Sequence, residues 1–173
     1  MTVTFHEASV ANYLQTIGAV GGFLGKGLAY FQENGIDPQS IVETRLAGDM
    51  LPFAFQLHSV VHHSVGAVAG MRSGLFRPPS PLPTQNYEQW QATIAEAQET
   101  LKGLTPEDMS AIEGNDVMFE LGKMKMPFTA TGFLFSFSLP NFYFHAATAY
   151  DILRSKGVPL GKRDFMGAVR LKM

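Results

Sequence analysis

Residues 139–163 read LPNFYFHAATAYDILRSKGVPLGKR, and this stretch decides the fold. Its apolar residues recur at helical spacing, and the helix is expected to stop at Gly157, where a glycine and a following proline form a C-terminal signal. Asn141, His145 and Thr148 lie three to four residues apart, so on a helix they share one stripe among aromatic side chains. Polar groups inside an apolar helix need partners. The stretch therefore predicts a helical protein with a polar site in its interior.

Three earlier segments show the same helical spacing of apolar residues. The first of them contains five glycines, which fits the close approach of another helix. Pro140 is expected to disturb the last helix near Ser136, because a proline has no N–H to give to that carbonyl. The predicted long helices span residues 7–34, 49–71, 87–101 and 129 or 131 to 156, with short helices over 39–46 and 105–112.

Two connections between these helices have recognisable sequence patterns. Residues 73–84 hold four prolines without periodicity, which is typical of a long surface crossover that lets neighbouring helices of a bundle run parallel. The segment from Val117 to Met126 alternates partially on both sides of Gly122, which predicts a small β-hairpin before the last helix. The expected fold class is all-α, a four-helix bundle with this crossover and hairpin, as one domain over residues 1–173.

Composition excludes several classes of function. The chain has no cysteine, so disulfides, thiolate nucleophiles and Cys-ligated zinc or iron–sulfur clusters are absent. A net charge of −2 with dispersed Lys and Arg argues against a nucleic-acid partner. The most apolar run, Phe133 to Phe144, is shorter than the roughly 20 residues that a membrane span needs. The N-terminus, Met1 to Glu7, has no signal-peptide pattern, so a cytoplasmic protein without a membrane partner is expected.

Three segments of the chain resemble the C-terminal signature of an uncharacterised bacterial family in the DinB/YfiT-like superfamily, namely LPNFYFH, TAYDILR and GVPLGKRD. A second anchor is RLAGDMLP at residues 45–52, and the wider resemblance covers most of the chain. It implies a four-helix bundle. In this superfamily, many members hold a divalent metal by three histidines, one on the second helix and a His-x-x-x-His pair on the last. This sequence departs from that pattern, because Asn141 stands four residues before His145.

The residues themselves also indicate a metal site between the second and fourth helices. His58 and His62 are four residues apart, so two imidazoles can meet one cation from the same helix face, and His145 can close the site from the opposing helix. Asn141 is a weaker ligand through its amide oxygen, and His63 is expected to point elsewhere. With only nitrogen and oxygen donors available, the predicted cofactor is Zn, Ni or Mn. The core-facing stripe of the second helix is predicted to be Leu51, Phe55, His58, His62, Val65 and Ala69.

An alternative remains open for each histidine, namely a partly buried core residue hydrogen-bonded to a backbone carbonyl or to Gln56, Tyr143 or Tyr150. The function is correspondingly open between two hypotheses. In the first, which the resemblance implies, the protein is a metal-dependent transferase or hydrolase acting on a small molecule. In the second it is a non-catalytic bundle with a degenerate metal site that binds a small ligand or forms a homodimer. The sequence names no catalytic residue.

Overall fold

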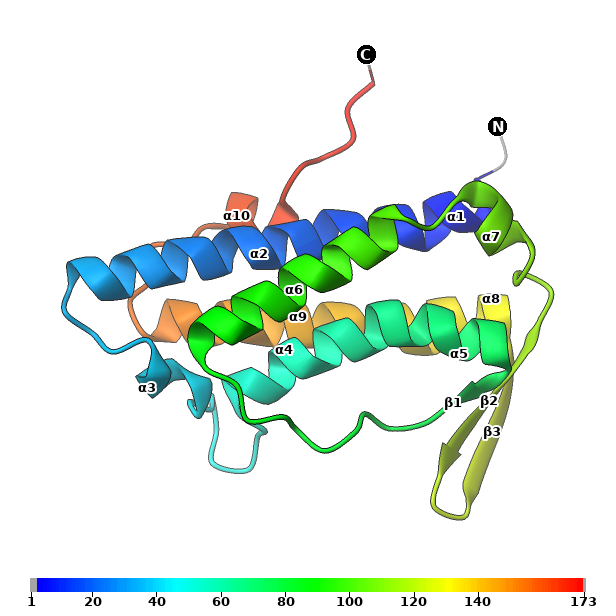
Figure 1. The fold of residues 1–173 in the computed structure, drawn as a ribbon, viewed down its shortest axis with the longest axis horizontal. Coiled ribbons are helices and arrows are strands. Elements are labelled where there is room, and N and C mark those ends of the chain that lie inside the picture. Colours follow the sequence, from blue (N-terminus) through cyan, green and yellow to red (C-terminus); the bar gives the residue numbers. More distant parts are fainter. Residues whose placement is uncertain (1–2, 173) are drawn as a thin grey trace.

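The computed structural model describes residues 3–172 and is mostly helical, with a small three-stranded sheet. Four long helical segments lie around one core, with the sheet at one end and the linker of residues 77–86 along one edge (Figure 1). Two of these segments each contain a π-helical turn, named η1 and η2. The elements are α1 (Phe5–Ala8), α2 (Val10–Glu33), α3 (Gln39–Val42), α4 (Phe53–Val61), η1 (His62–Gly66), α5 (Ala67–Ser73), β1 (Leu75–Phe76), α6 (Tyr87–Lys102), α7 (Pro106–Ser110), β2 (Asp116–Leu121), β3 (Met124–Thr129), α8 (Ala130–Phe133), η2 (Leu134–Ser138), α9 (Leu139–Ser155) and α10 (Lys162–Met166).

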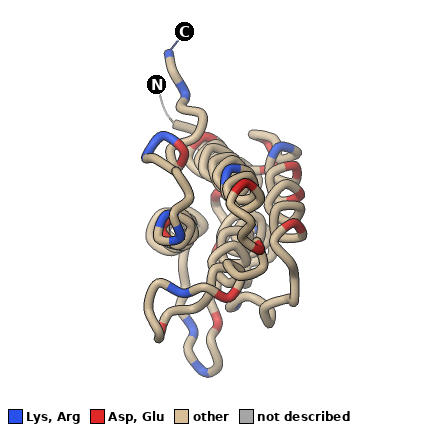
Figure 2. The backbone as a smooth tube through the Cα atoms, turned by 90° about the vertical axis from the view of Figure 1, so that its left-hand side faces the viewer, with Lys and Arg blue, Asp and Glu red and all other residues tan. Residues whose placement is uncertain are grey.

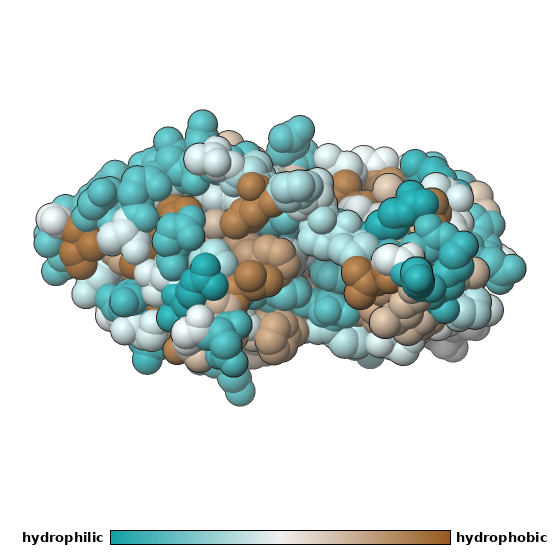
Figure 3. All heavy atoms as spheres, turned by 90° about the horizontal axis from the view of Figure 1, so that it is seen from below, coloured by the Kyte–Doolittle hydropathy of each residue, from teal (hydrophilic) through white to brown (hydrophobic). Residues whose placement is uncertain are grey.

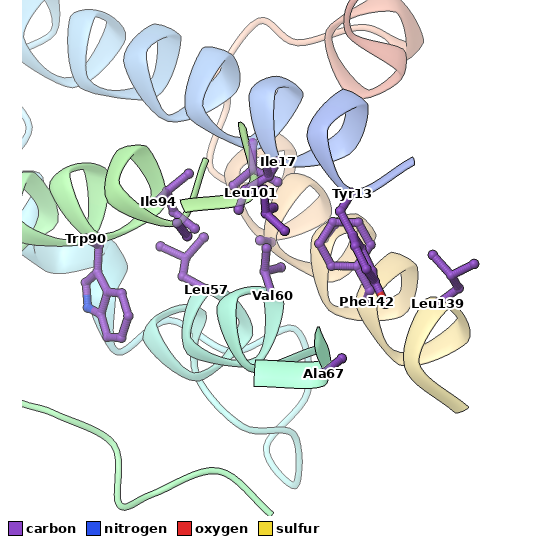
Figure 4. Close-up of a cluster of buried hydrophobic side chains, with 14 of the residues drawn as sticks. Tyr13, Ile17, Leu57, Val60, Ala67, Trp90, Ile94, Leu101, Leu139 and Phe142 are labelled. Carbon is purple, nitrogen blue, oxygen red and sulfur yellow. The ribbon is translucent and has the colours of Figure 1, made fainter. Parts of the chain in front are cut away.

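The core forms where apolar faces of the long helices meet. Helix α4 packs on α9 and α2 packs on α6, while α9 also contacts α2 and α4 also contacts α6. Figure 4 shows Leu57 of α4 pointing towards Ile94 of α6, and Val60 of α4 pointing towards Leu101 of α6, all of them almost completely buried. The ring of Tyr13 in α2 meets Phe142 of α9 edge to face, with ring centroids 5.1 Å apart. These contacts bury the apolar stripes that the sequence pattern identifies as helical.

The predicted long helices are confirmed, but the second begins later than expected. The sequence predicts a start near Asp49, whereas α4 begins at Phe53. The preceding segment is an ordered loop, because the Phe53 backbone N–H donates to the Thr44 carbonyl at 2.8 Å and Arg45 Nη1 donates to the Met50 carbonyl at 2.7 Å. The two short predicted helices exist but are shorter, as α3 and α7. Of the N-terminal stretch considered above, residues 1–2 lie outside the described residues.

The predicted hairpin is confirmed and is part of a larger sheet. Strands β2 and β3 pair antiparallel, with Leu121 opposite Met124 and Gly122 at φ +57° in the turn. The third strand, β1, pairs parallel to β2 and falls inside the segment that the sequence predicts as irregular crossover. Two residues are too few to show a strand period. β1 carries Phe76 into the core, where 3% of the residue is exposed.

Charges are spread thinly over the molecule. Figure 2 shows Lys, Arg, Asp and Glu dispersed along the chain without a cluster of one sign. Surface ion pairs such as Lys26–Asp164, with Nζ and Oδ1 2.6 Å apart, contribute little because solvent screens them. Within residues 3–172, no helix has the length and apolar character required to span a bilayer.

The glycines of α2 separate into two groups. A Cβ added at Gly27 would lie 2.5 Å from the Tyr87 hydroxyl of α6 and 3.4 Å from Leu153 of α9, so a helix approaches closely here as predicted. At Gly22 and Gly25 nothing beyond the adjacent residues and nearby backbone of the same helix lies within 4 Å of such a Cβ among the described residues, so the close-approach prediction is wrong for these two. The Tyr87 hydroxyl donates to the Leu24 carbonyl at 2.9 Å, which holds its position next to Gly27.

We therefore expect opposite effects of alanine at two glycines of one helix. Gly27→Ala should lower the free energy of unfolding by about 1–3 kcal/mol, because the methyl group overpacks the contact with Tyr87. Gly22→Ala, on the exposed side, should raise it by about 0.5–1 kcal/mol through helix propensity. Denaturant unfolding followed by circular dichroism measures both, and equal effects of the two substitutions would contradict the close approach.

Candidate functional site

The face of α4 and η1 that meets α9 is not the one predicted from periodicity. The predicted stripe, from Leu51 through His58 and His62 to Ala69, is half-buried or exposed. The side facing α9 instead carries the buried polar residues Gln56 and His63, which both contact His145. The predicted face is wrong because apolar residues occur on every side of this helix, so their spacing cannot show which face is buried. The expectation that His63 points elsewhere is therefore wrong.

Three histidines form a cluster between η1 and α9. The ring of His63 lies 5.1 Å from that of His62 and 5.8 Å from that of His145, centroid to centroid. The rings of His63 and His145 are nearly parallel, with 13° between their planes. Phe76 of β1 stacks on His62 at 4.4 Å and Phe137 of η2 lies 5.9 Å from His63. We call His62, His63 and His145 the histidine cluster; aromatic rings enclose it.

Burial keeps the histidine cluster uncharged. It lowers the pKa of His63 to about 3, with His62 and His145 adding a smaller effect of the same sign. It likewise lowers the pKa of His62 to about 4, against a weaker opposing effect of the Arg77 backbone. For His145 burial again comes first, followed by His62, and the pKa falls to about 4. At pH 7 all three imidazoles are neutral, the form in which histidine binds a metal or accepts a hydrogen bond.

Two ring nitrogens of the cluster are buried without a partner. Nε2 of His62 and Nδ1 of His63 have no hydrogen bond to any other group within residues 3–172. A buried polar atom left unpaired costs about 1–3 kcal/mol of stability. Such atoms are uncommon in native proteins, and they mark the place where a water molecule, an ion or a ligand would be bound.

A short chain of hydrogen bonds fixes which nitrogen of His145 carries its proton. The carbonyl of Leu51 only accepts, so the Gln56 amide group that meets it at 2.8 Å is Nε2. Oε1 of Gln56 therefore faces His145 Nδ1 at 2.7 Å, and this nitrogen must be the donor. The neutral ring then has its lone pair on Nε2. A metal-ligating histidine is oriented in the same way, by a hydrogen bond from its other nitrogen.

The remaining two residues of the predicted metal set lie elsewhere. His58 Nε2 lies 3.1 Å from the Ser80 carbonyl, so this ring faces the linker and not α9. Asn141 Nδ2 donates to the Phe137 carbonyl at 2.7 Å, one turn earlier. Its amide thus serves a carbonyl within the π-helical turn η2, close to where Pro140 was expected to disturb the helix.

The structure therefore brings together two members of the predicted set, His62 and His145, and adds His63. No three His, Asp or Glu side chains of the described chain stand in an arrangement that would hold a metal ion. The alternative of a histidine hydrogen-bonded within the protein applies to two of the predicted ligands. His58 bonds the Ser80 carbonyl, and His145 bonds Gln56.

A hydrogen-bond relay joins three helical segments behind the cluster. Ser138 Oγ of η2 donates to the His63 carbonyl of η1 at 2.7 Å. The hydroxyl of Tyr13 in α2 lies 2.6 Å from the same Oγ, and because that oxygen uses its own proton on the carbonyl, Tyr13 is the donor. Both side chains are completely buried, and burial raises the pKa of Tyr13, so the phenol keeps its proton. The relay anchors the backbone that carries His63.

Comparison with known proteins gives a family and a fold. A family model described as a domain of unknown function, DUF1993, matches residues 5–166. Among solved structures, the crystal structure of a DinB family member protein from Shewanella denitrificans is similar, with a TM-score of 0.81 and 22% sequence identity. The match covers 97% of this chain and 94% of that chain. At that identity the likeness concerns the fold alone. No curated protein matched.

Acid should destabilise the metal-free protein through the histidine cluster. Each folded-state pKa lies below the ordinary value of 6.5, so below that pH the unfolded chain binds protons that the folded chain does not. Stability is therefore complete above about pH 6.5 and is lost as the pH falls towards 4. Between pH 7 and 5 each histidine should contribute a loss of about 1–2 kcal/mol.

Guanidinium unfolding at pH 7 and pH 5, in the presence of a chelator, measures this loss. His63→Gln should reduce the difference in the free energy of unfolding between pH 7 and pH 5 by the contribution of one histidine. An unchanged difference in His63→Gln would show that the ring of His63 is not held neutral by burial.

The relay predicts strong coupling between two side chains from different helices. Ser138→Ala leaves the His63 carbonyl and the Tyr13 hydroxyl unpaired and should lower the free energy of unfolding by about 2–4 kcal/mol. Tyr13→Phe removes one bond and should cost about 1–2 kcal/mol. In a double-mutant cycle the second substitution should add little to the first. Ser155→Ala, an exposed serine at the far end of α9, is the matched control and should stay within about 0.5 kcal/mol. Strict additivity would contradict the relay.

Proposed function

Since the chain belongs to the DUF1993 family and has a DinB-like fold, we propose that it is a single-domain four-helix bundle that binds a divalent metal ion and acts with it on a small molecule. The proposed ligands are His62, His63 and His145. Compared with the set predicted from sequence, His63 takes the place of His58, and Asn141 is left out because its amide serves the backbone.

The observation that carries the proposal is the pair of unpartnered buried nitrogens, His62 Nε2 and His63 Nδ1. Neutral imidazole is a common metal ligand and needs no deprotonation before it binds. His145 adds a third nitrogen whose lone pair is fixed by Gln56. A set of nitrogen donors alone favours Zn or Ni over Mn among the metals predicted from the sequence. Such an ion supplies Lewis acidity, which lowers the pKa of a bound water or thiol.

Imidazole is a suitable metal ligand, but in this structure the nitrogens of the three rings do not converge on one point. The proposal therefore requires the rings to turn about their side-chain bonds when a metal binds. Gly66 is consistent with this requirement, since a Cβ at that position would lie 3.2 Å from His62 Nδ1 and would crowd the ring. The relay from Tyr13 through Ser138 would keep the backbone of His63 in place during such a movement.

The second candidate function is a non-catalytic small-ligand site at the same residues. It is favoured by Asn141, because this residue stands where the resemblance implies a histidine and makes a bond to its own helix. In this case a ligand group or water would satisfy the two free nitrogens by hydrogen bonds. The cytoplasmic location and the homodimer expected from the sequence remain predictions.

Metal titration distinguishes the two candidates. Protein without a histidine tag, stripped with a chelator, is titrated with Zn²⁺ and Ni²⁺ in competition with a chromophoric chelator. We expect one ion per chain, bound at micromolar concentration or tighter, and at least about tenfold weaker binding in His63→Ala and in His145→Ala.

His58→Ala is the matched control, because it removes a neighbouring histidine that faces the linker. Its affinity should equal that of the unmodified protein. Equal weakening by His58→Ala and His63→Ala would contradict the proposed ligand set. Binding weaker than micromolar in the unmodified protein would favour the non-catalytic site.

A further inference from the structure

A small pocket opens beside the histidine cluster, between the loop before α4 and the first turns of α9. Its volume is about 200 Å³, and its lining residues are Met50, Leu51, Phe55, Gln56, Phe144 and His145. Two of these lining residues are exposed apolar side chains, Leu51 at 49% and Phe144 at 58%. Figure 3 shows the face that bears this loop and the linker, where apolar residues interrupt the hydrophilic surface.

The ring of His145 is the wall between this pocket and the buried histidines. On the pocket side, the rings of Phe55 and Phe144 meet it edge to face at 5.9 Å and 5.2 Å. On the other side lies the nearly parallel ring of His63, 5.8 Å away. A molecule in the pocket would therefore contact His145 directly and would be one ring away from the rest of the cluster.

We propose that the pocket binds a small uncharged molecule with an aromatic or branched aliphatic body and one hydrogen-bond donor directed at His145. None of the lining residues is charged, so an ionised ligand would lose hydration without gaining a partner. Aromatic edges and a methionine thioether favour a ring as the body.

Only one polar side chain of the pocket, His145, is left for the ligand. The Gln56 amide is used at both ends, by the Leu51 carbonyl and by His145 Nδ1. In the metal-free protein the lone pair on His145 Nε2 is free to accept, so a hydroxyl or N–H of the ligand matches it. A metal ion on the same nitrogen would exclude this bond. A volume of about 200 Å³ holds a molecule of the size of a fused bicyclic ring.

This inference deepens the proposed function, because it names the class of molecule presented to the histidine cluster. Binding in the pocket does not itself require a metal. The test is therefore run on chelator-treated protein and repeated after adding Zn²⁺, which should weaken 2-naphthol binding if both proposals hold, because the ion and the hydroxyl compete for His145 Nε2. If 2-naphthol binds and Zn²⁺ does not, only the metal site is contradicted. If Zn²⁺ binds and 2-naphthol does not, only the pocket is contradicted.

The probe is 2-naphthol, which is neutral at pH 7 and carries one hydroxyl donor. Its controls are 2-methoxynaphthalene, which lacks the donor, and 2-naphthoate, which is charged. NMR of protein labelled at the methionine methyl groups and the histidine rings should show shifts at Met50 and His145 on adding 2-naphthol. We expect 2-naphthol to bind at least about tenfold more tightly than either control.

Two phenylalanines provide matched variants, since both are exposed and neither supports the core. Phe144→Ala removes one wall of the pocket and should weaken 2-naphthol binding by about tenfold or more. Phe135→Ala removes a phenylalanine of similar exposure, 53%, that does not line the pocket, and binding should be unchanged.

Three results would overturn the proposal: equal binding of 2-naphthoate, equal weakening by the two variants, or shifts away from Met50 and His145. A fourth would be a dimer by light scattering that Phe144→Ala converts to a monomer, because a second copy of the chain would then cover the pocket.

Discussion

The structure depends on how polar groups are accommodated where η1 meets η2 and α9. A hydroxyl relay, Tyr13 to Ser138 to the carbonyl of His63, joins α2, η2 and η1 at a point with no exposure to solvent. It anchors the backbone carbonyl of His63 while Nδ1 of the His63 ring is left without a partner. The same interface therefore contains fully satisfied hydroxyls and unsatisfied imidazoles. We interpret this contrast as the difference between the groups that hold the helices and the groups that hold a ligand.

The long helices and the hairpin were predictable because each has a strong local signal, such as the apolar period of α9 or the glycine turn at Gly122. β1 was not, since two residues carry no period. The histidine cluster was predictable only in part. His145 follows from the polar stripe of the last helix, but the choice between His58 and His63 depends on which face of a helix apolar on every side meets α9. The presence of Gln56 and His63 seven residues apart, at helical spacing, is the signal that could have identified that face.

The loop before α4 connects the fold to the chemistry. Its Leu51 carbonyl orients the Gln56 amide, and Gln56 in turn fixes the proton of His145 on Nδ1. The same loop supplies Met50 and Leu51 to the apolar pocket next to His145. This loop lies within RLAGDMLP, the second stretch that resembles the family signature. One segment thus sets both the tautomer of a candidate ligand and the shape of the space in front of it.

The central claim is that His62, His63 and His145 form one metal site. The most direct measurement is anomalous diffraction at the zinc edge from crystals of the tag-free protein grown with Zn²⁺. The account predicts a single strong peak about 2.0–2.2 Å from a ring nitrogen of each of these three histidines. A peak at His58 and His62 without His63, or peaks confined to the surface, would contradict it.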